Sequence, residues 1–373
     1  MTISAWSLGW RTLARDLRAG ELRLLIVAVT LAVAALTAVG FFADRLKGGL
    51  ARDARQLLGG DAVVVSDAPA PPSFAEQAKA LGLQSVGTLV FPSMARAPEA
   101  QGGASRLIAL KAVQEGYPLR GNLHVAPDPE SKGEKTREVP RRGEAWVEAA
   151  VLDSLGLKMG DPLLLGDAQL RIARVITLEP DRGTGFLNFV PRVMIHVGDL
   201  PVTRLVQPAS RIGWRLAVAG GDREVARFTE WAQAEARRPE VRGVRIESLD
   251  GGRPEMRQTL DRAEKFLNLV ALLAALLSAV AVALAARGFA SRHLDDCALL
   301  RVLGQSQRTI AWRYTFDFAV IGVAASVLGV AIGFAVHFVF IALLGGLVET
   351  SLPAPGVWPL AFGMGMGLTL LFA

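Results

Sequence analysis

Three long runs without a charged residue constrain this chain more than any other feature. They cover residues 24–43, 266–286 and 318–348 and contain 20, 21 and 31 residues. About 20 residues of helix cross a bilayer core, and each Leu, Ile, Val or Phe favours insertion by roughly 0.3–0.6 kcal/mol. We therefore predict three complete transmembrane helices over these ranges.

A fourth apolar stretch covers residues 358–373. It stops about four residues short of a comfortable span, so we expect a truncated fourth transmembrane helix in the N-terminal half of a longer protein. The GMGMG run from Gly363 to Gly367 lies within this stretch. Small residues at this spacing predict close packing against another helix.

The first apolar run follows a basic stretch, as a signal peptide would, but it is too long for a signal-peptide core and lacks a small-residue cleavage pattern before Asp44. We interpret it as a retained anchor. Residues 1–23 carry Trp6, Trp10 and Leu13 at helical spacing, which predicts a cytosolic amphipathic helix in the headgroup layer. The alternative is that they simply begin the first membrane helix.

Arginine asymmetry between the short loops predicts the orientation. Residues 287–317 contain five arginines, whereas residues 349–357 contain no lysine or arginine. Positive loops remain in the cytosol, so the 287–317 loop and the N-terminus should be cytosolic and residues 44–265 external. For a multi-pass protein of a bacterial inner membrane, the external side is the periplasm.

Charged helical stretches flank the external region. Leu46, Leu50 and Leu57 lie near one side of the first, and a similar apolar side follows Pro254 in the second. We interpret both as stalks that continue the membrane helices outward. The alternative is that they pack on the external domain.

The external region mixes both types of secondary structure. We predict strands at residues 61–66, 105–113 and 241–246 and helices at residues 73–81 and 224–237. We predict antiparallel β-structure over residues 156–181. Residues 127–142 are charged and flanked by prolines, which predicts a mobile insertion. The predicted fold is a membrane α-helical bundle with a large α+β extracytoplasmic domain of two lobes, a βαβ-type lobe interrupted by a β-rich one.

The chemistry of a catalytic centre is missing from the sequence. No stretch matches the phosphate-binding G-x-x-x-x-G-K-[ST] loop, the G-x-S-x-G elbow or the H-E-x-x-H helix. One cysteine and four histidines give little basis for a disulfide or metal site. We therefore predict no catalytic, cofactor or metal residues. The net charge of +6 suits nucleic acid or an anionic membrane, and the apolar runs favour the lipid bilayer over nucleic acid.

The predicted cytosolic loop contains SRHLDDCALLRVLGQSQRTI, residues 291–310, which reads as a short amphipathic helix that ends near Gly304. Such a helix suits docking into a groove on another protein. This segment resembles the cytoplasmic segment of FtsX-like ABC transporter permeases, with Asp296 in place of the usual Glu and Cys297 in place of a common Ile. By this resemblance, the residues that couple to an ATPase are Leu294, Asp296, Cys297, Leu300, Arg301 and Gly304.

The resemblance extends over nearly the whole chain. The order of one membrane helix, a long external domain and then clustered helices is similar to that of MacB-like permeases. The segments EPDRGTGFLNFVPRVMIHVGDL and VQPASRIGWRL are most similar to YbbP-type permeases.

This resemblance implies a non-catalytic permease subunit, driven by a separate cytosolic ABC ATPase, that exports or extracts hydrophobic or lipid-like compounds through movement of its periplasmic domain. It also implies a second permease unit, in a missing C-terminal half or a homodimer mate, and an esterase-like periplasmic partner. One alternative is an FtsX-like scaffold that transmits ATPase motion to an envelope hydrolase without transport. The third hypothesis is a membrane-tethered periplasmic enzyme, which the missing catalytic motifs disfavour.

Overall fold

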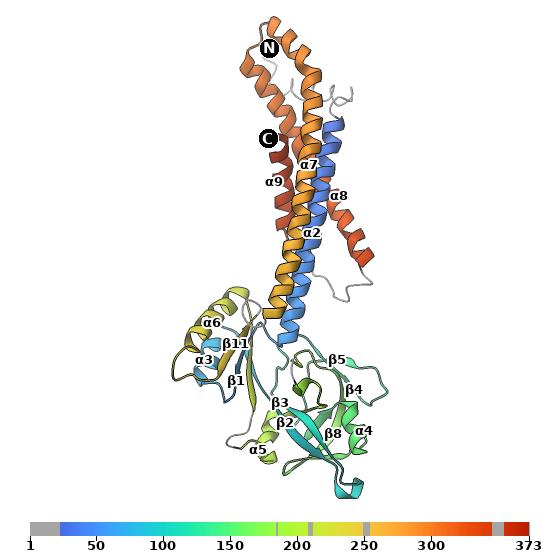
Figure 1. Ribbon diagram of the computed structural model, residues 1–373, viewed down its shortest axis with the longest axis vertical. Helices are drawn as coiled ribbons and strands as arrows, with labels where there is room; N and C mark the ends of the chain where they lie inside the picture. The colour runs from blue at the N-terminus through green and yellow to red at the C-terminus, as the bar shows by residue number, and fades with distance from the viewer. Residues whose placement is uncertain (1–22, 184–185, 208–211, 249–253, 345–353, 373) are drawn as a thin grey trace, which may run out of the picture. The chain divides into compact units, whose positions relative to one another are not determined.

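The computed structural model describes residues 23–183, 186–207, 212–248, 254–344 and 354–372 (Figure 1). Of the amphipathic helix predicted at residues 1–23, residues 1–22 lie outside this part of the chain. The chain divides into two compact units. One unit, which we call the membrane unit, takes in residues up to Leu50 and from Gln258 onward; the other, which we call the extracytoplasmic domain after its predicted location, takes in Ala51–Arg257.

Long helices build the membrane unit. They are α2 (Arg23–Leu58), α7 (Pro254–Val302), α8 (Gln307–Leu344) and α9 (Trp358–Phe372). The first three contain segments long and apolar enough to cross a membrane: Ile26–Leu58, Asn268–Gly288 and Gln307–Leu343. At 1.5 Å per residue, the 36 residues of α2 and the 49 of α7 extend about 54 Å and 74 Å, well beyond a hydrocarbon core of about 30 Å.

Glycines bring α8 and α9 close to α2. A Cβ atom on Gly333 of α8 would lie 2.7 Å from the carbonyl oxygen of Ala34, and one on Gly367 of α9 would lie 2.8 Å from Val33 Cγ2. Gly363 also faces a neighbour, whereas a Cβ on Gly365 would meet nothing within 4 Å. The close packing predicted for the GMGMG run is therefore confirmed for two of its three glycines.

A histidine also links α8 to α2. The side chain of His337 is completely buried, and Arg45 Nη1 donates to its Nε2 at 3.2 Å. The ring packs against Phe338 and Phe334, with centroid distances of 4.1 Å and 4.9 Å. The structure therefore encloses His337 between α8 and α2.

Part of the extracytoplasmic domain follows a ferredoxin-like path. Strand β1 lies between β11 and β10, β10 pairs with β2, and all these pairings are antiparallel. Helices α3 and α6 cover this sheet, with Phe74 and Phe228 in a shared core. The bounds are β1 (Ala62–Ser66), α3 (Pro72–Ala80), β2 (Gln84–Arg96), β10 (Gly213–Ala219), α6 (Asp222–Glu235) and β11 (Val244–Ser248).

The same sheet continues into a closed barrel. The hydrogen-bonded path β2–β3–β9–β6–β8–β7 returns to β2, because Ala95 and Arg96 pair with Leu165 and Leu164. Closure removes the free strand edges and encloses a large apolar core that includes Ile108, Leu110 and Val193. The new elements are β3 (Ser105–Val113), β6 (Glu144–Val147), α4 (Ala149–Leu155), β7 (Pro162–Leu165), β8 (Ala168–Leu178), β9 (Arg192–His196) and α5 (Leu200–Thr203).

The predicted mobile insertion at residues 127–142 is partly a strand. Residues Glu134–Thr136 form β5, which pairs with β4 (Leu123–Ala126) at the end of the sheet. Before β5, both carboxylate oxygens of Asp128 accept hydrogen bonds from Ser131. The charged composition therefore marks an edge strand and a turn, where polar side chains stay in water.

Candidate functional site

Helix α7 carries the predicted coupling residues beyond the membrane segment. The apolar segment ends at Gly288 and the helix continues to Val302, a projection of 14 residues or about 21 Å. The sequence suggested a separate short helix in a loop over residues 287–317. Instead, this region is helical except around the turn at residues 303–306, so the coupling segment is rigidly continuous with a membrane helix.

Gly304 ends this projection. Its φ of +83° is left-handed, its N–H donates to the Arg301 carbonyl at 3.0 Å, and the Gln305 N–H donates to the Leu300 carbonyl at 3.1 Å. These two bonds form a Schellman motif, in which glycine is favoured because it lacks a Cβ. The helix end predicted at Gly304 is confirmed.

The next helix begins almost at once. Ser306 Oγ accepts the Thr309 N–H at 3.2 Å, which satisfies one of the free donors in the first turn of α8. With only Leu303–Ser306 between them, α7 and α8 form a compact hairpin, and we call residues 294–312 the coupling hairpin.

Apolar side chains are unusually exposed on the coupling hairpin. Leu294 is 67% exposed, Leu299 64% and Val302 87%. Leu303 and Trp312 are similarly open, Arg301 is exposed and Leu300 is half-buried. The side chains of Asp296 and Cys297 lie outside the described set, although their backbone is helical. Several adjacent apolar groups in an otherwise polar segment are typical of a protein-binding surface.

The extracytoplasmic domain contains a buried ion-pair network that the sequence analysis did not single out. Lys111 Nζ donates to Glu179 Oε1 at 2.6 Å and to Asp181 Oδ1 at 2.8 Å. Arg192 Nε donates to Glu179 Oε2 at 2.7 Å, and the hydroxyl of Tyr117 donates to Asp181. The four charged side chains are at most 4% exposed, and their formal charges cancel. Burial of charge is tolerated because each ion meets an opposite charge.

The network shifts the pKa of two of its members, Tyr117 and Asp181. Burial raises the pKa of the Tyr117 phenol well above its ordinary value, and the negative charges of Asp181 and Glu179 raise it further. Burial alone would also raise the pKa of Asp181, but the charge and hydrogen bond of Lys111, with the bond from Tyr117, bring it below its ordinary value. With no solvent access, these groups stabilise the domain and cannot reach a substrate. Glu179 and Asp181 lie in the EPDR run at residues 179–182, but this run carries no local signal for their burial or for their distant partners.

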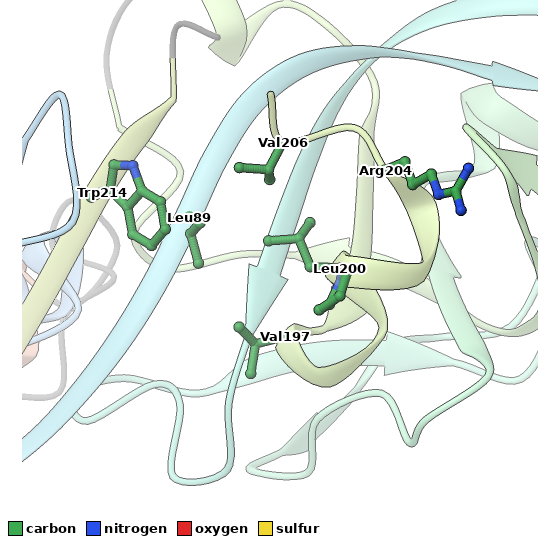
Figure 2. A pocket seen from close by; sticks show the side chains of 7 residues that line it. Leu89, Val197, Leu200, Arg204, Val206 and Trp214 are labelled. Carbon is green, nitrogen blue, oxygen red and sulfur yellow. The ribbon is translucent and has the colours of Figure 1, made fainter. Parts of the chain in front are cut away.

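A shallow cavity of about 280 Å³ opens beside this barrel (Figure 2). Its lining is apolar except for Arg204, whose guanidinium extends away from Trp214 in Figure 2. It therefore offers no acid, base or nucleophile. The lining residues are Leu89, Val197, Leu200, Pro201, Arg204, Val206 and Trp214. Among the residues that the structure describes, no group of three His, Cys, Asp or Glu side chains could hold a metal ion.

Known proteins resemble both parts of the chain. Residues 268–373 match the model of the family described as FtsX-like permease C-terminal. Over 351 residues, 94% of its length, the chain is 30% identical to the uncharacterized ABC transporter permease YbbP of Escherichia coli K12, and it spans 42% of that relative.

Two solved structures are also similar. The periplasmic region of MacB from Actinobacillus actinomycetemcomitans has a TM-score of 0.34 and 12% identity, and the match covers 56% of this chain and 95% of that one. The extracellular domain of YknZ from Gram-positive bacteria has a TM-score of 0.33 and 11% identity, and its match covers 50% and 100% of the two chains.

Proposed function

Residues 268–373 belong to the FtsX-like permease family of ABC transporters, and from this premise we propose that the chain is the ATPase-coupled part of a permease subunit. A separate cytosolic ABC ATPase hydrolyses ATP and drives movement of the extracytoplasmic domain, which exports or extracts hydrophobic or lipid-like compounds. The subunit resides in a bacterial inner membrane with its N-terminus in the cytosol. A second permease unit and an esterase-like periplasmic protein complete the assembly.

The observation that carries this proposal is the continuity of α7. One helix joins the membrane segment Asn268–Gly288 to the exposed apolar residues of the coupling hairpin. A partner protein whose groove binds Leu294 and Leu299 would bind the same helix that crosses the bilayer. Motion of that partner then reaches the membrane without passing through a flexible loop.

Copurification tests the coupling hairpin directly. The full chain, extracted from membranes with its ATPase, is compared with Arg301→Glu, which reverses a charge on the exposed end of α7. Loss of an arginine contact in a desolvated groove costs about 2 kcal/mol, so ATPase affinity should fall about thirtyfold. Arg238→Glu, the same change at an exposed arginine of the extracytoplasmic domain, is the matched control. Equal ATPase recovery with both variants would overturn the coupling assignment.

Proteoliposomes separate transport from scaffolding. ATP-dependent release of lipid or of a hydrophobic dye by the assembled complex supports the transport role. ATP hydrolysis without release, together with activation of a copurified hydrolase, would replace it with the FtsX-like scaffold role. Purified chain that hydrolysed ATP without a partner would contradict both.

Cysteine labelling tests the orientation. In a Cys297→Ser background, Glu130→Cys introduces a single exposed thiol into the extracytoplasmic domain. It should react with an impermeant maleimide from the periplasmic side, and Gln305→Cys in the coupling hairpin only after the membrane is opened. Reaction of Glu130→Cys from the cytosolic side alone would reverse the proposed topology.

A further inference from the structure

Asp61, immediately after α2, is a buried hub of polar contacts. Its side chain is 4% exposed, and both oxygens accept hydrogen bonds from Arg120, from Nε to Oδ1 at 2.9 Å and from Nη2 to Oδ2 at 2.6 Å. The Gly220 N–H donates to Oδ2 at 3.0 Å, and Arg55 Nε lies 3.6 Å from Oδ1. A bidentate arginine–carboxylate pair is among the strongest and most directional contacts in proteins.

These contacts join segments that are distant in sequence. Arg55 belongs to the last turn of α2, and its Nη2 also donates to Asp222 Oδ1, at the start of α6, at 2.8 Å. Arg120 belongs to the connection between β3 and β4, and Gly220 to the connection between β10 and α6. We call Arg55, Asp61, Arg120, Gly220 and Asp222 the Asp61 joint.

The short connection from α2 to β1 is itself fixed. Gly59 has a left-handed φ of +75°, and a Cβ there would lie 2.9 Å from Asp181 Oδ2. A Cβ on Gly60 would lie 3.0 Å from the Val218 carbonyl oxygen. Both glycines are therefore required by close approach to the domain. A Gly-Gly pair in a sequence often indicates a flexible linker, but here it allows tight packing.

Backbone hydrogen bonds also hold this connection. The Gly59 N–H donates to the Gln56 carbonyl at 3.0 Å and the Asp61 N–H to the Val218 carbonyl at 2.8 Å. Arg215 Nη2 donates to the Leu58 carbonyl at 3.4 Å, which satisfies an acceptor at the helix end. The end of α2 thus contacts the ferredoxin-like part of the domain through Val218 and Gly220 and the buried ion-pair network through Asp181.

We propose that the Asp61 joint locks the last turns of α2 to the sheet of the extracytoplasmic domain, so that these turns and the domain move as one body with Asp61 as the positioning residue. Because α2 is a single helix from Arg23 to Leu58, tilt or rotation of its membrane segment is then passed to the domain. Only this last step rests on the proposed function. The rigidity of the joint is independent of it.

Spin-label distances in the full chain test the joint. In the Cys297→Ser background, one label pair joins Arg52→Cys on α2 to Glu230→Cys on α6, and a second pair joins Glu230→Cys to Asp153→Cys on α4, wholly within the domain. All three label positions are exposed. In lipid nanodiscs the distribution of spin–spin distances should be narrow for both label pairs. Asp61→Ala should at least double the width for the α2–α6 pair and leave the domain pair narrow.

Two further variants make the outcome decisive. Arg55→Ala removes the α2 side of the joint at a residue 34% exposed, so the domain should stay folded while the α2–α6 distribution broadens. Asp67→Ala, an exposed carboxylate at the other end of β1, should change neither distribution.

Unchanged α2–α6 widths in Asp61→Ala and Arg55→Ala would overturn the joint. If Asp61→Ala broadens the distance distributions of both label pairs because the domain unfolds, the α2–α6 width in Arg55→Ala decides whether the joint exists. The measurement contains no ATP and no ATPase, so a failed joint is distinguishable from a failed coupling hairpin.

Discussion

The membrane unit and the extracytoplasmic domain build their interiors from different chemistry. In the membrane unit, glycines such as Gly329 and Gly333 let α8 approach the backbone of α2. In the domain, a closed barrel encloses an apolar core, and a neutral network of buried ions lies on the opposite face of β3 and β9. Helices in lipid gain little from the hydrophobic effect, because acyl chains are as apolar as leucine, so close packing decides their association. In water, apolar burial drives folding and leaves room for a few paired charges.

This difference predicts different sensitivities. The membrane unit should be sensitive to added side-chain volume at its glycines and the domain to loss of a single charge in its network. Both effects are measurable in the same full-length chain, in detergent or nanodiscs, by hydrogen exchange of the helix and strand amides.

The largest effect is expected from Lys111→Met, which keeps a long side chain but removes the charge. Glu179 would then keep the hydrogen bond from Arg192, whereas Asp181 would lose its ion pair and keep the hydrogen bond from Tyr117. Breaking a buried ion pair typically costs about 3–5 kcal/mol. Protection of the β3 and β9 amides should fall accordingly. Lys158→Met at an exposed position is the control, and equal protection in the two variants would show that the network contributes nothing.

A smaller loss is expected from Gly333→Val in the membrane unit. The new side chain would meet the backbone of α2 at Ala34, and overpacking of this kind costs about 1–3 kcal/mol. Thermal unfolding in detergent should shift downward, and a disulfide engineered between α2 and α8 should form more slowly. Gly365→Val is the matched control because its Cβ points into open space. Equal shifts for the two variants would contradict the packing account.

The elements that local pattern controls were predictable. Strand β1, helix α3, strand β3 and helix α6 lie within two residues of their predicted bounds, because periodicity and proline breaks are local signals. The helix end at Gly304 followed from the same reasoning. The three long apolar helical segments were predictable because about 20 apolar residues leave few alternatives.

Barrel closure and the buried network were not predictable. Closure depends on β7 pairing with β2 across about 70 positions, Ala95 with Leu165 and Arg96 with Leu164, and no local pattern encodes such a register. Lys111 and Asp181 are 70 positions apart and each reads as an ordinary surface residue. In the site, the helix end at Gly304 was predictable. Of the two predicted leucines, Leu294 is exposed and Leu300 is half-buried, and the exposed Leu299 was not among the predicted residues. The continuity of α7 from its apolar segment to Val302 was not predicted, because the charged residues of 287–301 favoured a loop after the apolar run.

Acid sharpens the comparison because the buried network of the domain contains a carboxylate, Asp181, whose pKa is lowered by its partners. The pKa of Asp181 in the folded protein lies below its ordinary value of 3.8, so its contribution to stability is fully present above that value. It is lost as the pH falls through the lower, folded pKa. Domain stability should therefore decline below about pH 4. Asp181→Asn should be less stable at neutral pH and show a flatter acid decline, measured by tryptophan fluorescence; an unchanged slope would contradict this assignment.

The smallest effect is expected from an ion pair on the outside of the same barrel. Arg171 Nη2 lies 2.8 Å from Glu144 Oε1, as close as Lys111 lies to Asp181, but the Arg171 side chain is 62% exposed. Water already solvates both ions, and holding two long side chains together costs entropy, so exposed pairs contribute about 0–1 kcal/mol. Arg171→Ala should therefore change the free energy of unfolding by less than about 1 kcal/mol, and the change should shrink further in high salt. If Arg171→Ala destabilised the domain as much as Lys111→Met, contact distance alone would determine the strength of these pairs, and burial would have no part in the difference between the two sites.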